Sequence, residues 1–285
     1  MRTITHLMLS VLLAAMASAA DLHPPAQVTA GSAFSISSSG SGDATFYLVG
    51  PSHVLKRQVK LGQAIAVDGD HVQTSGRYLA IACGSDGCSS APFYVVAGEP
   101  DRLSFLLHPS RVPVSRGDAI NATAFVFDKF RNLVLKPVTV DFRITPKTGA
   151  PFTKTVKSDR GVAWMKMAST PKEGPVKVIA TVASAAEPRI IQQVASDACN
   201  LRIRASRTAK SVLIETDPVR DCSGNAVPDG TIVSFTAIDS NGKTTVDAPI
   251  KKGVARAELP LTGGARISVA SGVVIGNEIT VGGRS

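Results

Sequence analysis

Hydrophobic and polar residues alternate in short runs along this chain. In the run 138–144, Val-Thr-Val-Asp-Phe-Arg-Ile, every second residue is apolar. The runs 163–167 and 255–259 place an apolar residue at the same spacing. Because successive side chains of a β-strand point to opposite faces, each run predicts a strand with one buried face.

Such runs recur between turns rich in Gly, Pro, Ser and Asp, and no long segment after residue 20 has the period of a helix. The sequence therefore predicts an all-β fold built from many short strands. The expected strands are 34–36, 45–49, 64–67, 76–83, 93–96, 103–107, 119–127, 138–144, 162–167, 176–182, 201–204, 211–215, 231–237, 254–259, 267–270 and 279–281.

Part of this pattern is repeated. Segment 128–142 aligns without a gap with segment 221–235, and Asp, Asn, two Val and Phe fall at the same offsets. The tripeptide Gly-Val-Ala at 161–163 also recurs at 253–255. A repeat of this length indicates one structural plan used at least twice, so we expect an array of domains.

The N-terminus has the features of an export signal. Arg2 precedes a mostly apolar stretch at 7–17, and small residues at 17–20 suit cleavage. The stretch is shorter than the about 20 apolar residues that a spanning helix needs. We expect a signal peptide at 1–20, domains at 21–98, 99–195 and 196–285, and no transmembrane segment in the mature form. The expected location is the periplasm, the cell surface or the medium.

Positive charge is concentrated in the middle of the chain. Residues 99–195 hold 15 Lys and Arg against 8 Asp and Glu, whereas residues 21–98 hold 4 against 5 and residues 196–285 hold 11 against 9. We expect the densest run to lie in a loop and its flanks. It is a candidate patch for an anionic partner, and the alternative is a solvated face without a ligand. The run comprises Lys147, Lys154, Lys157 and Arg160.

All four cysteines follow the expected signal, which suits disulfides. Cys83 and Cys88 enclose a turn-forming Gly-Ser-Asp-Gly, and Cys199 and Cys222 both fall in the last domain. Of the three possible pairings we favour Cys83–Cys88 with Cys199–Cys222. Because the two pairs lie in different domains, a four-cysteine zinc site is disfavoured.

No sequence motif for catalysis or for cofactor binding is present, and the four histidines after residue 20 are scattered. Asp221, Ser223 and Asn225 resemble the first ligands of a calcium loop, but the glycine at the sixth position and the distal Glu are missing. Such residues are typical of turns, where Asn also tolerates a left-handed backbone, so we expect no metal site. Nucleic acid is not an expected partner, because few aromatic residues accompany the basic ones.

Two aromatic residues carry separate expectations. Gly76-Arg-Tyr78 resembles the corner before strand F of an immunoglobulin-like sandwich. The register of 163–167 directs Trp164, the only tryptophan, away from the core. We expect a neighbouring strand or loop to cover Trp164, and the alternatives are a contact with another domain or with a ligand.

Asp-x-x-x-Asn-x-Val, the following Val-x-Phe and the later Gly-Val-Ala resemble bacterial immunoglobulin-like domains of the invasin and intimin type. The resemblance extends from about residue 103 to the C-terminus and is strongest over 221–235. It implies a tandem of immunoglobulin-like β-sandwiches that forms a non-enzymatic spacer or adhesive array outside the cytoplasm. It implies a protein or glycan of the cell envelope as partner. The alternative is a soluble binding subunit that recognises an anionic envelope polymer through its basic middle domain.

Overall fold

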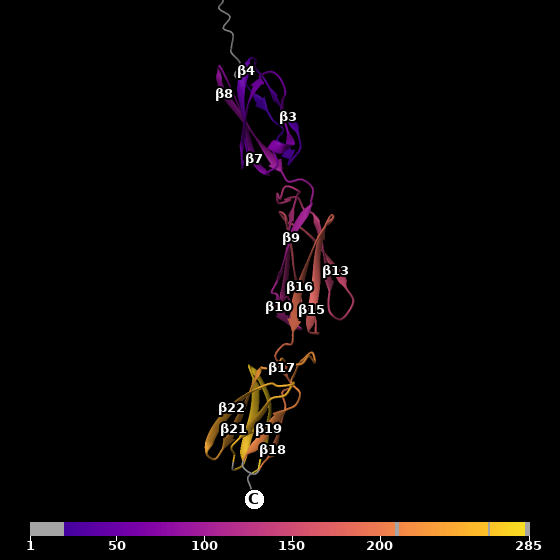
Figure 1. Ribbon diagram of the computed structural model, residues 1–285, viewed down its shortest axis with the longest axis vertical. Helices are drawn as coiled ribbons and strands as arrows, with labels where there is room; N and C mark the ends of the chain where they lie inside the picture. Colours follow the sequence, from indigo (N-terminus) through magenta and orange to yellow (C-terminus); the bar gives the residue numbers. More distant parts are fainter. Residues whose placement is uncertain (1–19, 209–210, 262, 283–285) are drawn as a thin grey trace, which may run out of the picture. The chain divides into compact units, whose positions relative to one another are not determined.

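The structure, a computed structural model, describes residues 20–208, 211–261 and 263–282 (Figure 1). Except for Ala20, the expected signal peptide lies outside these residues. The described part is almost entirely β, and its one helix is the short 3₁₀ turn η1 (Gly69–His71). No helix in these ranges has the length and apolarity needed to cross a membrane. The chain forms two compact units, one of residues through Arg102 with Phe127–Leu135, the other of Leu103–Val126 with the remainder.

The first sandwich packs a three-stranded sheet, in the order β1-β3-β6, against a five-stranded sheet, in the order β2-β8-β7-β4-β5. All its pairings are antiparallel except that of β2 with β8. Its strands are β1 (Leu22–His23), β2 (Gln27–Thr29), β3 (Phe34–Ser38), β4 (Asp43–Val49), β5 (Val54–Lys60), β6 (Ile65–Val67), β7 (Gly76–Gly84) and β8 (Gly87–Val96).

The second sandwich repeats this plan with a sheet in the order β14-β11-β9 and a five-stranded sheet in the order β10-β16-β15-β12-β13. Again one pairing, β10 with β16, is parallel. Its strands are β9 (Arg102–His108), β10 (Arg111–Pro113), β11 (Ile120–Phe127), β12 (Thr139–Thr145), β13 (Phe152–Lys157), β14 (Val162–Met167), β15 (Gly174–Val182) and β16 (Ala185–Val194).

The third sandwich consists of the sheets β18-β19-β23 and β22-β21-β24-β25, and a two-stranded sheet of β17 and β20 stands beside them. The strands described here form no parallel pair of the kind found in the other two sandwiches. They are β17 (Ala198–Cys199), β18 (Ile203–Arg207), β19 (Val212–Thr216), β20 (Arg220–Asp221), β21 (Ile232–Asp239), β22 (Gly242–Pro249), β23 (Arg256–Leu259), β24 (Ala265–Ser271) and β25 (Val274–Val281).

The apolar faces predicted from alternation fill the cores. Phe142 and Phe235, which coincide in the sequence repeat, are both 0% exposed. In the second sandwich the ring centroid of Phe142 lies 5.7 Å from that of Phe105 on the opposing sheet. In the first, the buried Tyr78 donates its hydroxyl to the Thr74 carbonyl at 3.0 Å, as expected for the tyrosine corner. The all-β sandwich prediction is confirmed.

Several edge strands escaped prediction, and one of them changes the interpretation of the basic run. The run was expected in a loop and its flanks, and Lys154 and Lys157 lie in a regular flanking strand, β13. β13 is the last strand of its sheet, and nearly all of its residues are exposed on both faces. A strand exposed on both faces has no buried stripe, so its sequence shows no clear apolar alternation.

The environment of Trp164 also differs from the prediction. The residue points away from the core, as the register indicated, but it is 60% exposed. The expectation that a neighbouring strand or loop covers it is therefore wrong. β14, which carries it, is an edge strand of its sheet.

Candidate functional site at the repeated Asp–Asn corner

The first corner, residues 128–132, is organised by a buried carboxylate. Oδ1 of Asp128 accepts the backbone N–H groups of Phe130 at 2.9 Å and of Asn132 at 2.8 Å. Oδ2 accepts the N–H of Gly98 at 2.9 Å and the Asn132 side-chain amide at 2.9 Å. Since Asp128 is only 1% exposed, these four donors replace the water that an ionised carboxylate would otherwise need.

The Asn132 side chain extends the corner to the loop before β7. Its Oδ1 accepts the backbone N–H of Ser75 at 2.7 Å, and its Nδ2 donates to the Gln73 carbonyl at 2.7 Å. The amide thus uses both ends to bind main chain that lies more than fifty residues earlier in the sequence. All these residues belong to the first compact unit.

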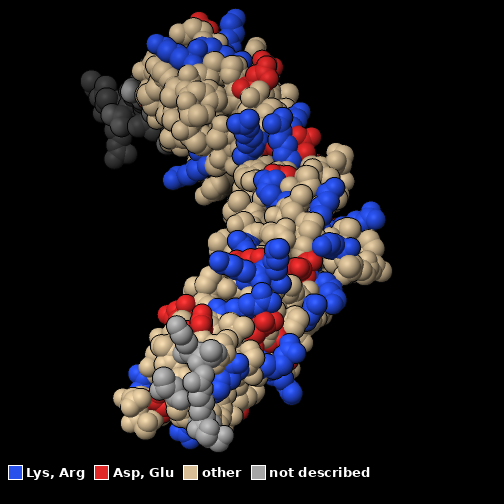
Figure 2. Space-filling view, turned by 60° about the horizontal axis from the view of Figure 1, so that its bottom comes forward, with Lys and Arg blue, Asp and Glu red and all other residues tan. Residues whose placement is uncertain are grey.

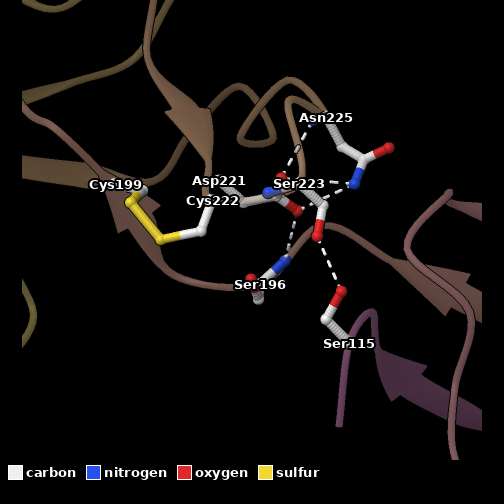
Figure 3. The surroundings of a disulfide bond; sticks show 7 residues. All are labelled: Ser115, Ser196, Cys199, Asp221, Cys222, Ser223 and Asn225. Carbon is white, nitrogen blue, oxygen red and sulfur yellow. Dashed lines mark hydrogen bonds between the residues drawn. A yellow bond between two sulfur atoms is a disulfide. The ribbon is translucent and has the colours of Figure 1, made fainter.

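The second corner, residues 221–225, repeats this arrangement atom for atom (Figure 3). Oδ1 of Asp221 accepts the N–H groups of Ser223 and Asn225, each at 2.9 Å. Oδ2 accepts the N–H of Ser196 at 3.1 Å and the Asn225 side-chain amide at 2.9 Å. Ser196 precedes the third sandwich as Gly98 precedes the second, so each carboxylate binds the chain segment that enters its own sandwich.

Asn225 binds the second sandwich as Asn132 binds the first. Its Nδ2 donates to the Pro171 carbonyl at 2.8 Å, and its Oδ1 accepts the Glu173 N–H at 3.3 Å. Glu173 stands directly before β15, which occupies the place in its sheet that β7 occupies in the first sandwich. The repeated Asp and Asn therefore do more than form a turn, because they also bind the preceding sandwich.

The left-handed backbone of each corner falls on the residue before Asn. The positive φ belongs to Arg131, at 68°, and to Gly224, at 82°. Asn132 and Asn225 therefore contribute through their side-chain amides.

The surroundings of Asp221 favour its ionised form. Burial raises the pKa of this carboxyl, but hydrogen bonds from the Asn225 side chain and from the N–H groups of Asn225, Ser196 and Ser223 outweigh burial and hold the pKa below its ordinary value. The carboxylate is therefore charged across the neutral range, which strengthens each of its hydrogen bonds.

A disulfide reinforces the second corner. Cys199 in β17 bonds Cys222 in the corner, with an S–S distance of 2.07 Å (Figure 3). The other bridge, Cys83–Cys88, joins β7 to β8 one residue before the tip of their hairpin. The structure thus contains both disulfides of the favoured pairing.

The side-chain oxygens of Asp221 and Asn225 already accept hydrogen bonds. Both oxygens of Asp221 accept N–H donors, and Asn225 uses its carbonyl oxygen for Glu173. Calcium would need these oxygens as ligands. Over the described ranges, no group of three or more His, Cys, Asp and Glu is placed to hold a metal ion. The chemistry of the corner is structural, and it consists of satisfying buried N–H groups.

The four residues of the basic run are not gathered on one surface. Lys154 and Lys157 are three residues apart on β13 and point to opposite faces. Lys147 follows the end of β12, next to Gly174, whereas Lys157 pairs with Thr139 at its start. Figure 2 shows Lys and Arg spread over the surface in view rather than in one cluster.

The backbone partners of the two corners could not be identified from the sequence. Gln73, Ser75, Pro171 and Glu173 contribute main-chain atoms alone, and any residue type supplies a carbonyl. The sequence did mark the position of the corners, because Asp and Asn occupy the same offsets in both repeats.

The sequence matches no protein-family model, and no curated protein is significantly similar to it. Solved structures share its fold. The adhesin FdeC of Escherichia coli superposes with a TM-score of 0.65 at 14% identity, covering 98% of this chain and 100% of that one. Invasin, a bacterial integrin-binding protein, gives a TM-score of 0.52 at 12% identity, covering 93% of this chain and 60% of that one.

This chain therefore spans 60% of the length of the invasin structure. At such low identity the likeness establishes the fold. It agrees with the two-sheet sandwiches described above. The fold is that of tandem bacterial immunoglobulin-like domains of the invasin and intimin type.

Proposed function

We propose that this chain is an exported, non-enzymatic array of immunoglobulin-like domains that serves as a spacer or adhesive module at the cell surface. The observation that carries the proposal is the duplicated corner. The same Asp and Asn atoms bind the incoming chain segment and the preceding sandwich at both places. Hydrogen bonds that hold the segment entering each sandwich suit an array built from repeated domains.

The adhesins among the solved structures with this fold also support the proposal. The experiment is retention of the mature chain on washed cell-envelope fractions and on immobilised glycans. We expect saturable retention from low to physiological salt. Absence of retention at every salt concentration would contradict the adhesive part of the proposal and leave a spacer.

A second candidate is a periplasmic or secreted binding subunit that recognises an anionic envelope polymer. The outward face of β13-β12-β15 favours it. Strand register places Lys157, Arg143 and Lys177 on this face, and all three are exposed. The intervening Asp141 accepts a hydrogen bond from the Thr155 hydroxyl at 2.6 Å.

The triple variant Arg143→Ala/Lys157→Ala/Lys177→Ala tests this candidate. We expect it to abolish salt-sensitive retention on an anionic polymer, because opposite charges at an exposed surface attract less as salt rises. A matched variant that changes Lys147, Lys154 and Arg160 to Ala removes equal charge from positions outside this face and should cause a smaller loss. Equal losses would indicate attraction by net charge alone.

A further inference from the structure

Trp164 is the only tryptophan of the chain, and it lies exposed on a flat sheet surface. It stands on β14 in the sheet β14-β11-β9, on the face turned away from the core. A Trp side chain that is 60% exposed leaves a large apolar surface in water. Exposed apolar surface that is rimmed by polar residues is typical of binding sites.

Strand register identifies the neighbours of Trp164. It pairs with Thr123 of β11, and the next outward pair is Lys166 with Asn121. The pair on the other side is Val162 with Phe125. Adjacent strands lie about 4.8 Å apart, so these side chains form one continuous surface. The surface has an apolar end, a central indole, and a polar end with an amide and an ammonium group.

The corresponding surface of the third sandwich carries an ion pair instead. Arg256 occupies the position of Trp164 in the sequence repeat, and its Nε donates to Glu215 on the paired strand at 2.8 Å. This ion pair provides each charged group with a partner within the chain. At the same place the second sandwich has the Trp164 indole opposite the Thr123 hydroxyl. The surface around Trp164 is therefore found in the second sandwich and not in the third.

The composition of this surface fits a sugar ring that carries an acid group. A pyranose presents C–H groups on its flat side, which suit an indole face, and hydroxyls at its rim, which suit an amide and a hydroxyl. Lys166 adds a cation beside the indole, and residues 99–195 carry a net charge of 15 − 8 = +7. Opposite charge would attract an acidic glycan to this sandwich before it binds.

We propose that the outward face of β14-β11-β9 binds an acidic glycan, with one ring stacked on Trp164. Asn121 and Thr123 bind its hydroxyls, and Lys166 binds its carboxylate. This inference rests on the adhesive function proposed above and names the class of ligand.

Trp164 fluorescence provides a direct test, because no other tryptophan contributes to the emission. The mature chain is titrated with oligosaccharides of galacturonic acid, hyaluronan and polysialic acid, and with a neutral glucose oligomer of equal length. We expect a saturable change in emission with at least one acidic oligosaccharide and none with the neutral one. Unchanged emission with all three acidic oligosaccharides would overturn the proposal.

Variants locate the site by retention on the immobilised oligosaccharide. Trp164→Thr should weaken binding about thirtyfold, as expected for an aromatic anchor, and Trp164→Phe should be intermediate. Lys166→Ala should weaken binding about fivefold. Lys147→Ala removes an exposed lysine beside the start of β15, in the opposite sheet, and should change little. Equal effects of the two lysine variants, or full retention of Trp164→Thr, would overturn the proposal.

The same measurements separate this inference from the adhesive function. If the envelope fractions retain Trp164→Thr as well as they retain the parent chain, the array is adhesive through another surface. In that case the glycan proposal alone fails. Circular dichroism of each variant confirms folding, which an exposed strand position should tolerate.

Discussion

The corners at Asp128 and Asp221 share their hydrogen bonds but differ at the three residues between Asp and Asn. In both, one carboxylate accepts four N–H donors and one amide binds an earlier loop. The intervening residues are Lys-Phe-Arg in the first corner and Cys-Ser-Gly in the second. The shared part is therefore the part that satisfies buried polar groups.

The differing residues give each corner its own attachment. In the first corner, Phe130 packs against the core of the first sandwich, and its ring occupies the space where a Cβ on Gly31 would lie. In the second, Ser223 bonds the hydroxyl of Ser115 in the preceding sandwich at 2.7 Å, and the disulfide Cys199–Cys222 ties the corner to β17 of its own sandwich. One corner thus has an aromatic ring packed on the preceding sandwich, and the other has a hydrogen bond to it and a covalent bond within its own sandwich. The comparison shows that hydrogen bonding defines the corner, whereas the means of attachment varies.

Removing the carboxylate should have the largest effect, and the effect should be alike in both corners. Asp128→Ala and Asp221→Ala each leave several buried N–H groups without an acceptor, and we expect a loss of about 3 kcal/mol in the free energy of unfolding. Scanning calorimetry measures the loss. Asp141→Ala serves as control, because this exposed carboxylate has one hydroxyl donor and should lose well under half as much. A small loss at either corner would contradict their equivalence.

Removing the disulfide should weaken the second corner alone. Cys199→Ser with Cys222→Ser opens a loop with a sequence separation of 23, and we expect a loss of about 3 kcal/mol. The change should appear as faster hydrogen exchange in peptides of the third sandwich. Cys83→Ser with Cys88→Ser opens a loop with a separation of 5 and should cost less. If exchange accelerated around Asp128 as well, the two corners would not be independent.

A side chain on Gly31 would collide with the Phe130 ring and should weaken the first corner alone. In Gly31→Ala the new Cβ would lie 2.3 Å from the ring, and the backbone φ of 75° disfavours alanine, so we expect a loss of about 2 kcal/mol. Gly42→Ala has a φ of 96° but no neighbour within 4 Å, so it measures the backbone part alone. Adding Phe130→Ser should recover part of the Gly31→Ala loss. Equal losses for the two glycine variants would show that the ring packing contributes little.

Acid should loosen the second corner by a smaller amount. Because the folded pKa of Asp221 is below its ordinary value of 3.8, its contribution to stability is present above that pH. The contribution is lost as the pH falls through the folded pKa. We expect the unfolding temperature of the third sandwich to fall below about pH 4, and Asp221→Asn to reduce that dependence. A variant with the same acid sensitivity as the parent would assign the effect to other carboxylates.

The sequence predicted the cores well because burial leaves a periodic trace. Phe142 and Phe235 followed from alternation, and their burial is complete. The strand β13 left no such trace, since water contacts both of its faces. Trp164 was assigned to the correct face, but alternation reports direction and carries no information on what covers a side chain.

The candidate site was predictable in part. Coincident Asp and Asn residues marked the corner, and the disulfide at Cys222 followed from cysteine placement. The hydrogen bonds of Asn132 to Gln73 and Ser75 could not be predicted. They use backbone carbonyl and N–H groups, which are the same in every residue other than proline. Tertiary structure alone brings that loop within hydrogen-bond distance.

The central claim is that each Asn binds the sandwich before it. Amide hydrogen exchange, followed by NMR, tests this claim at two backbone N–H groups. The N–H of Ser75 donates to Oδ1 of Asn132, and the N–H of Glu173 donates to Oδ1 of Asn225. We expect both amides to be protected in the parent chain. Asn132→Ala should expose Ser75 alone, and Asn225→Ala should expose Glu173 alone. Free exchange of both amides in the parent, or protection that survives both substitutions, would contradict the account.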